Sequence, residues 1–130
     1  ERRVRERALE VLETCALAGK SGELAGRLSG GQHKLLELAR VLMIDPQLIL
    51  LDEPAAGVNP VLLEILVERI VALHRGGIAF LVIEHNMDLV MSVCEPIVVM
   101  MAGRVVCEGS ANAVRRDPRV LDAYLGEVPA

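Results

Sequence analysis

The sequence predicts an α/β fold with a parallel sheet and flanking helices. Two short, continuous apolar runs, residues 48–51 and 78–83, have the length and composition of strands that are buried on both faces. A segment with helical periodicity, about 60–74, lies between them, which is the order of a β–α–β unit. Both runs are followed at once by ionisable residues, and ligands of open parallel sheets bind beyond the carboxyl ends of the strands.

The N-terminal part of the chain is predicted to be helical. Residues 2–17 repeat apolar side chains at helical spacing, with Arg and Glu on the opposite face. After a stretch that contains several glycines, a second helix is expected over about 31–44, with Ser29 at its N-cap position. Asp45-Pro46 ends this helix, and the pattern changes there from helical to α/β.

The rest of the chain alternates between the two periods. The central helix is opened by Asn59-Pro60 and closed by Gly76-Gly77. The pattern then predicts, in order, a short helix over 87–93, a hairpin of strands 97–101 and 105–107 that turns at Gly103, and a helical tail over about 111–125.

Composition excludes several classes of function. The chain is 52% hydrophobic, but no apolar run approaches the ~18 residues of a membrane span, and no secretory signal pattern is present, so we expect a cytosolic protein. Its three cysteines form no cluster, which argues against a disulfide framework or a zinc site. With a net charge of −4, one Phe, one Tyr and no Trp, it lacks the features of a nucleic-acid binder.

The ionisable residues after the two strands are the first candidate site. Asp52 and Glu53 follow one strand, and Glu84 and His85 follow the other, so both pairs are expected at one edge of the sheet. A charged carboxylate beside a buried strand costs free energy unless it has a binding partner. A metal ion bound to nucleotide phosphates would suit one of the two carboxylates, and an attacking water would suit the other. An ordinary acidic turn is the alternative. For Glu84, a polar strand end and a supporting role are both open.

The second candidate is Ser29-Gly30-Gly31-Gln32 at a helix start. A helix N-terminus offers unpaired N–H groups and the positive end of the dipole, and glycines let an anion approach closely. The segment is therefore a plausible phosphate clamp. The alternative is an N-capped helix with a flexible entry.

Taken together, the order and spacing of these features resemble those of one family. Leu28 to Gln32 resembles the signature sequence of ABC ATPases, Leu48 to Glu53 resembles their Walker B strand, and His85 resembles their switch histidine. The resemblance implies part of a P-loop NTPase fold. Residues 1–45 would be the end of the helical subdomain, and residues 46–130 the C-terminal part of the RecA-like core.

The resemblance also implies roles and ligands, with ATP and Mg²⁺ as cofactors. Asp52 would hold Mg²⁺, Glu53 would be the general base, and His85 would contact the γ-phosphate. Ser29, Gly30, Gly31 and Gln32 would meet ATP held by a second ATPase subunit, while 55–59 would be the D-loop at that interface. This loop reads Ala-Gly-Val-Asn where the family commonly has Ser-Ala-Leu-Asp, which puts the hydrogen-bonding role of Asn59 in doubt.

Within the family, three segments resemble the branched-chain amino-acid importer ATPases. They are Glu-Pro-Ala-Ala-Gly-Val-Asn-Pro at 53–60, Ile-Glu-His-Asn-Met-Asp-Leu-Val at 83–90 and Ala-Tyr-Leu-Gly-Glu at 123–127. Urea or amide importers and the lipopolysaccharide exporter are related alternatives. The resemblance implies transmembrane permease partners, an indirect link to a solute-binding protein, and a place on the cytoplasmic side of the membrane.

A Walker A loop is not found in these residues. Gly19-Lys20-Ser21 lacks the earlier glycine, and a helix rather than a strand precedes it. We therefore expect that these 130 residues are the C-terminal half of an ATPase, inactive alone, with an apolar sheet face that the other half covers. The alternatives are a non-catalytic subunit that contributes only a signature face, and an ABC ATPase that serves something other than transport.

Overall fold

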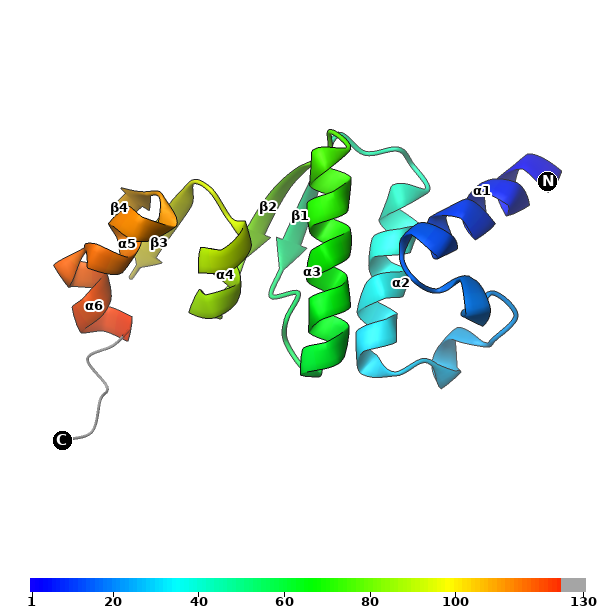
Figure 1. The fold of residues 1–130 in the computed structure, drawn as a ribbon, viewed down its shortest axis with the longest axis horizontal. Helices are drawn as coiled ribbons and strands as arrows, with labels where there is room; N and C mark the ends of the chain where they lie inside the picture. The colour runs from blue at the N-terminus through cyan, green and yellow to red at the C-terminus, as the bar shows by residue number, and fades with distance from the viewer. Residues whose placement is uncertain (125–130) are drawn as a thin grey trace. The chain divides into compact units, whose positions relative to one another are not determined.

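The computed structural model describes residues 1–124, with Tyr124 described by its backbone alone. The chain forms two compact units, Glu1–Glu84 and the part from His85 onward (Figure 1). The division after Glu84 separates two sets of residues that make most of their contacts among themselves. The division after residue 45 that the sequence predicts separates two subdomains of a larger fold, and it stays a prediction.

The first unit contains three helices and a two-stranded sheet. Its elements are α1 (Arg2–Thr14), two short 3₁₀ turns (Ala18–Lys20 and Ala25–Arg27), α2 (Gly30–Leu42), β1 (Leu48–Asp52), α3 (Pro60–Arg75) and β2 (Ala79–Ile83). These lie within a few residues of the predicted positions, and α2 and α3 run side by side (Figure 1).

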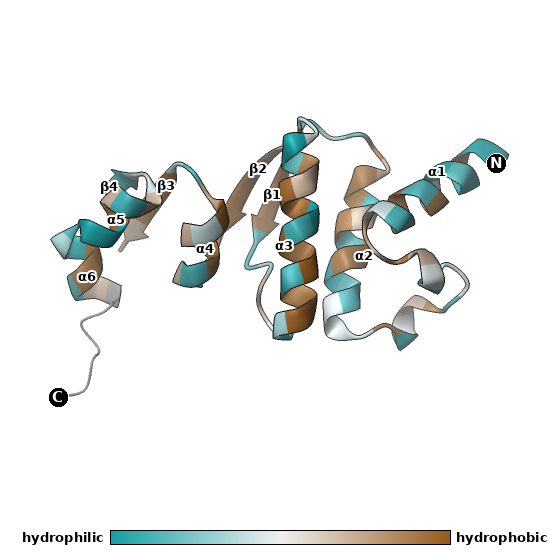
Figure 2. Cartoon of the chain, viewed as in Figure 1, coloured by the Kyte–Doolittle hydropathy of each residue, from teal (hydrophilic) through white to brown (hydrophobic). Residues whose placement is uncertain are grey.

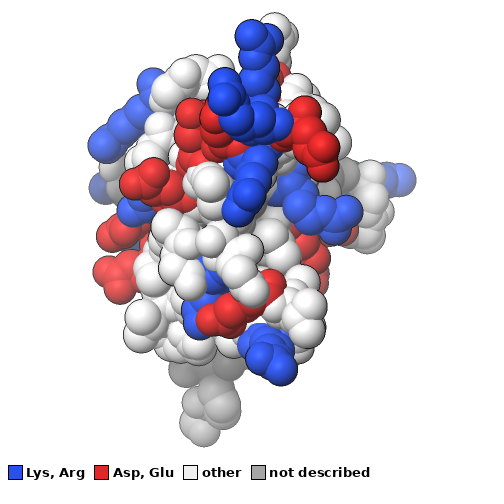
Figure 3. Space-filling model, turned by 90° about the vertical axis from the view of Figure 1, so that its right-hand side faces the viewer, with Lys and Arg blue, Asp and Glu red and all other residues white. Residues whose placement is uncertain are grey.

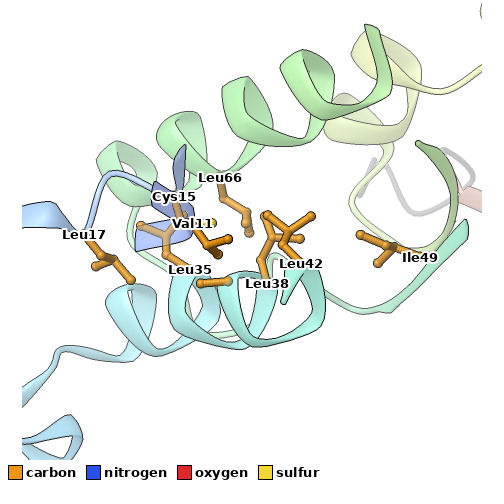
Figure 4. Packing of buried hydrophobic residues seen from close by; sticks show 9 residues of the cluster. Val11, Cys15, Leu17, Leu35, Leu38, Leu42, Ile49 and Leu66 are labelled. Carbon is orange, nitrogen blue, oxygen red and sulfur yellow. The ribbon is translucent and has the colours of Figure 1, made fainter. Parts of the chain in front are cut away.

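The core of this unit lies where the three helices meet. Leu66 of α3 points toward the buried leucines of α2, and α1 adds its own apolar side chains (Figure 4). The buried members are Val11, Cys15, Leu17, Leu35, Leu38, Ala39, Leu42, Ile49 and Leu66. Full burial of an aliphatic side chain contributes about 1.5–3 kcal/mol, so this cluster is the main source of stability in the unit.

The sheet of the first unit is covered on one face only. β1 and β2 pair in parallel, as predicted, with Leu48 opposite Ala79 and Asp52 opposite Ile83. Successive side chains of a strand point to opposite faces. Ile49 is buried in the core, whereas Leu50 is 67% exposed and Ile83 is 60% exposed. The expectation that both faces are covered is therefore wrong for this chain, and the expectation of an exposed apolar face is confirmed. Both strands are coloured as hydrophobic in Figure 2.

The second unit is a hairpin with short helices. Its elements are α4 (Met87–Val93), β3 (Ile97–Met101), β4 (Arg104–Gly109), α5 (Ala111–Arg116) and α6 (Pro118–Tyr124). β3 and β4 are antiparallel, and the turn residues Ala102 and Gly103 both have positive φ, the conformation of a type I′ turn. Ile97 and Val99 pack with Val114 of α5 and Val120 of α6.

The helical tail predicted over about 111–125 is confirmed over 111–124, where it forms two helices, α5 and α6, with a break between them. Asp117 has an extended backbone between α5 and α6, because the ring of Pro118 disfavours the helical conformation at the residue before it. Asp117 then accepts hydrogen bonds from the backbone and the guanidinium of Arg119, and these bonds lower the pKa of its carboxyl to about 2. The segment 125–127, part of the tail that resembles the importer ATPases, lies outside the described residues.

The surface carries both charges. Lys and Arg side chains are intermixed with Asp and Glu on the face shown in Figure 3. Arg7 of α1 is paired with Glu10 and also with Asp45, which follows α2. Exposed pairs of this kind contribute at most about 1 kcal/mol. Across residues 1–124, none of the helices has the length and apolar character needed to cross a membrane.

Cys15 provides a test of how α1 packs. Its side chain is fully buried, and burial raises the pKa of its thiol from 9.0 to about 11, against a smaller lowering by the charge of Arg69. At pH 8 we expect ~100-fold less thiolate than for an unshifted cysteine, and correspondingly slow alkylation by iodoacetamide. Because the folded state holds the proton more tightly, the associated stability is present below pH 9 and is lost as the pH rises through about 11.

Cys94 is the internal control, because it is partly exposed. Mass spectrometry of partially labelled protein should find Cys94 modified before Cys15, and all three cysteines should react after unfolding in denaturant. Equal labelling rates for Cys15 and Cys94 in the folded protein would show that α1 does not pack as described.

Candidate functional site at the end of the parallel sheet

The candidate site is built on the shared end of β1 and β2. Asp52 is the last residue of β1, and the N–H of Glu53 donates to the carbonyl of Ile83 at 2.8 Å, which extends the pairing by one residue. The strand ends therefore meet at one edge, as the sequence predicts. The side chains of Asp52 and Glu53 are exposed at this edge.

The chain turns sharply directly after β1. Glu53 has a positive φ of 46°, a left-handed conformation that costs a residue other than glycine about 1–2 kcal/mol. The carbonyl of Glu53 accepts from the N–H of Ala56 at 3.0 Å, and the N–H of Val58 reaches the carbonyl of Ala55. Sequence reasoning missed this strain, and the only signal for it was Pro54, which disfavours the right-handed helical conformation at Glu53.

Glu84 holds this turn from the end of β2. Its Oε1 accepts a hydrogen bond from the N–H of Ala55 at 2.7 Å, in a partly buried setting. Glu84 is therefore bonded to the turn, and the supporting role in the site that the sequence leaves open stays a prediction. His85 belongs to the second unit and is exposed, so its expected convergence with Asp52 and Glu53 stays a prediction.

The segment Ser29-Gly30-Gly31-Gln32 forms a capping box at the start of α2. Ser29 Oγ accepts from the N–H of Gln32 at 3.3 Å, and Gln32 Oε1 accepts from the N–H of Ser29 at 2.9 Å. The predicted N-cap is confirmed. The first N–H groups of the helix have no carbonyl partner one turn earlier, so this end is suited to an anion.

The two glycines of this segment have different surroundings. A Cβ on Gly31 would lie 2.5 Å from Leu62 Cδ1 and 2.8 Å from Leu62 Cβ, so α2 and α3 approach each other through this glycine. A Cβ on Gly30 would meet only the carbonyl oxygen of Gly57, at 3.8 Å. The start of α2 therefore lies beside the turn that follows Glu53, and the structure brings these two candidate segments together.

Asn59 ends that turn as the N-cap of α3. Its Oδ1 accepts from the N–H of Leu62 at 3.0 Å, with Pro60 at the first helical position. This structural role accounts for the residue within the chain. A further role of Asn59 toward a nucleotide stays a prediction.

A cavity of about 180 Å³ opens between α2, β1 and α3. It is lined mostly by apolar side chains, with Lys34, Glu37 and Asp52 as its charged members. Its volume is below the ~300 Å³ of a typical small-molecule pocket. Among residues 1–124 no group of three His, Cys, Asp or Glu side chains is placed to hold a metal.

Comparison with known proteins identifies the family. The family model of the ABC transporter matches residues 1–56, and that of the branched-chain amino acid ATP-binding cassette transporter matches 104–130. In Archaeoglobus fulgidus, the probable branched-chain amino acid transport ATP-binding protein LivG is 43% identical over 126 residues, with 97% of this chain and 49% of LivG covered. The chain belongs to the ATP-binding subunits of ABC transporters.

Further relatives of this ABC subunit support the assignment. The lipopolysaccharide export system ATP-binding protein LptB of Haemophilus influenzae is 36% identical, with 95% of this chain and 51% of LptB covered. The crystal structure of the ADP conformation of MJ1267, an ATP-binding cassette of an ABC transporter, superposes with a TM-score of 0.88 at 39% identity. That match covers 98% of this chain and 52% of MJ1267, and the ABC subunit described here spans about half the length of the curated relatives it matches.

Substitution of the two signature glycines separates packing from other roles. Gly31→Ala should destabilise the protein by about 1–3 kcal/mol, because the new methyl overlaps Leu62. Gly30→Ala is the matched control and should be neutral or slightly stabilising, because alanine favours a helix and finds open space there. Urea unfolding of the two variants measures both effects.

Leu62→Ala in the Gly31→Ala background tests the cause. It removes two of the three atoms that the new methyl meets, so part of the lost stability should return. Equal stability of Gly30→Ala and Gly31→Ala would show that the helices do not meet at this glycine.

Proposed function

We propose that the intact protein is the ATP-hydrolysing subunit of an ABC importer, with branched-chain amino acids as the transported solutes. The observation that carries the proposal is the in-register end of β1 and β2, where Asp52 and Glu53 lie exposed in the same unit as the capped start of α2. Two carboxylates at this edge suit two tasks of phosphoryl transfer to water, the binding of Mg²⁺ and the orientation of the attacking water.

Asp52 is the proposed magnesium ligand. Mg²⁺ is held in proteins by one or two carboxylates together with substrate phosphates and water, rather than by a cage of protein ligands. One exposed carboxylate at the end of β1 fits this coordination. When bound, the ion neutralises charge on the phosphates of ATP.

Glu53 is the proposed general base. It follows Asp52 directly, and its strained turn directs the chain away from the sheet edge while the side chain remains exposed. A carboxylate there accepts a proton from the attacking water and orients a lone pair of the water oxygen toward the γ-phosphate. His85, two residues after β2, is the proposed contact to that phosphate.

Ser29, Gly30, Gly31 and Gln32 are proposed to bind ATP held by a second ATPase subunit. The capping box leaves the Ser29 hydroxyl hydrogen available to donate to an anion while its oxygen accepts from Gln32. The adjacent segment 55–59, ending at Asn59, would lie at the same dimer interface.

The proposed partners are this second ATPase subunit, transmembrane permease subunits on the cytoplasmic side of the membrane and, indirectly, a solute-binding protein. Without a Walker A loop, residues 1–130 alone are proposed to be inactive. A non-catalytic subunit that contributes only its signature face is the alternative.

The transported solute is proposed from the relatives' names. LivG of Archaeoglobus fulgidus and the match at 104–130 favour branched-chain amino acids. LptB, at 36% identity, supports lipopolysaccharide export as the second candidate, and urea or amide import is a related one. Uptake of labelled leucine by vesicles that contain the protein and its permease partners separates import from export.

Replacement of the base tests the mechanism. In the full-length protein, Glu53→Gln should lower the kcat of ATP hydrolysis by at least ~100-fold, because the amide cannot accept the proton, while ATP binding persists. Phosphate release and retention of labelled ATP on the purified protein measure the two effects.

Glu64→Gln is the control, because Glu64 is an exposed glutamate on α3. Its turnover should equal that of the unsubstituted protein. Unchanged hydrolysis in Glu53→Gln would refute the role of Glu53 as base.

A further inference from the structure

The four peptide groups after β1 show how the turn at the site is held. The N–H of Glu53 donates to Ile83, Pro54 has no N–H, and the N–H of Ala56 donates to Glu53 within the turn. The N–H of Ala55 donates instead to the side chain of Glu84, the residue that follows β2.

This bond has the properties of a strong constraint. At 2.7 Å it is short, it joins residues 29 positions apart in the sequence, and it is partly buried. Hydrogen bonds to a charged acceptor are shorter and about twice as strong as neutral ones. Ile83 and Glu84 are consecutive residues. The end of β2 therefore accepts two hydrogen bonds from the turn, one from the residue before Pro54 and one from the residue after it.

The two hydrogen bonds lie on either side of a strained part of the backbone. Glu53 has a left-handed backbone at φ 46°, and such a conformation persists only where the surroundings over-determine it. The direction of the Glu53 side chain depends on that backbone. A turn freed at Ala55 could relax at Glu53 and move the carboxylate.

We propose that Glu84 is a positioning residue for hydrolysis, which fixes the turn 53–56 through the N–H of Ala55 and thereby aims the Glu53 carboxylate. The inference rests on the proposed function of Glu53 as base. In this role Glu84 acts on Glu53 through the backbone of the turn. The position requires an acceptor oxygen on a side chain as long as that of Glu. The negative charge strengthens the hydrogen bond further.

Two substitutions in the full-length protein separate this role from general stability. Glu84→Ala removes the acceptor and should lower kcat by roughly tenfold or more, with the KM for ATP unchanged, because a small misplacement of a catalytic group is costly while the phosphate contacts remain. Glu84→Gln retains an acceptor oxygen at the same reach and should restore most of the kcat.

A second readout is independent of turnover. Hydrogen exchange of the nucleotide-free protein should become faster at the Ala55 amide in Glu84→Ala and remain slow in Glu84→Gln, while exchange in the core of α2 is the same in both. Exchange at Ala55 unchanged by Glu84→Ala, or kcat equal to that of the unsubstituted protein, would overturn the proposal. So would an equal loss of kcat in Glu84→Ala and Glu84→Gln.

Glu53→Gln in the same assay distinguishes the two claims. Loss of hydrolysis in Glu53→Gln with full hydrolysis in Glu84→Ala overturns the positioning role and leaves the base in place. Full hydrolysis in Glu53→Gln overturns the proposed function itself, and with it the route by which Glu84 would act, even where exchange at Ala55 responds as expected.

Discussion

The parallel pairing of β1 with β2 is the constraint on which the candidate site depends. The register that sets Asp52 opposite Ile83 makes both strands end at one level. The turn after β1 is then held by two hydrogen-bond acceptors at the end of β2, the carbonyl of Ile83 and the carboxylate of Glu84. A shift of one residue would exchange the faces of a strand and separate these partners, so the geometry of the turn follows from the geometry of the sheet.

The close approach of α2 and α3 positions the second candidate segment, at the start of α2. Leu66 of α3 enters the core formed with α2, and at Gly31 the two helices come near enough that no further carbon fits beside Leu62. The start of α2 is thereby kept beside the turn at Gly57. Interiors packed to this density transmit displacement instead of absorbing it, so the capped helix and the turn after β1 behave as one piece.

Much of this was accessible from the sequence, for identifiable reasons. Strands, helices and the Ser29 cap follow from local periodicity and capping chemistry, which depend on neighbours in the chain. The break at Asp117 follows from Pro118, which disfavours a helical backbone at the residue before it. The left-handed Glu53, the Glu84 bond to Ala55 and the contact of Gly31 with Leu62 arise between residues distant in sequence or from backbone strain, and neither leaves a periodic signal. The exposed sheet face could be foreseen only once the family resemblance implied a larger fold.

The contact at Gly31 limits what its presence in a sequence can reveal. A position that packing alone restricts to glycine would keep glycine in a descendant that had ceased to hydrolyse ATP, because loss of the residue would cost the fold. Gly30, with open space around it, is under no such restriction. For recognising degenerate subunits among relatives of this chain, a replacement at Gly30 or Ser29 is thus the more informative sign, and an intact Gly31 is no evidence of a working enzyme.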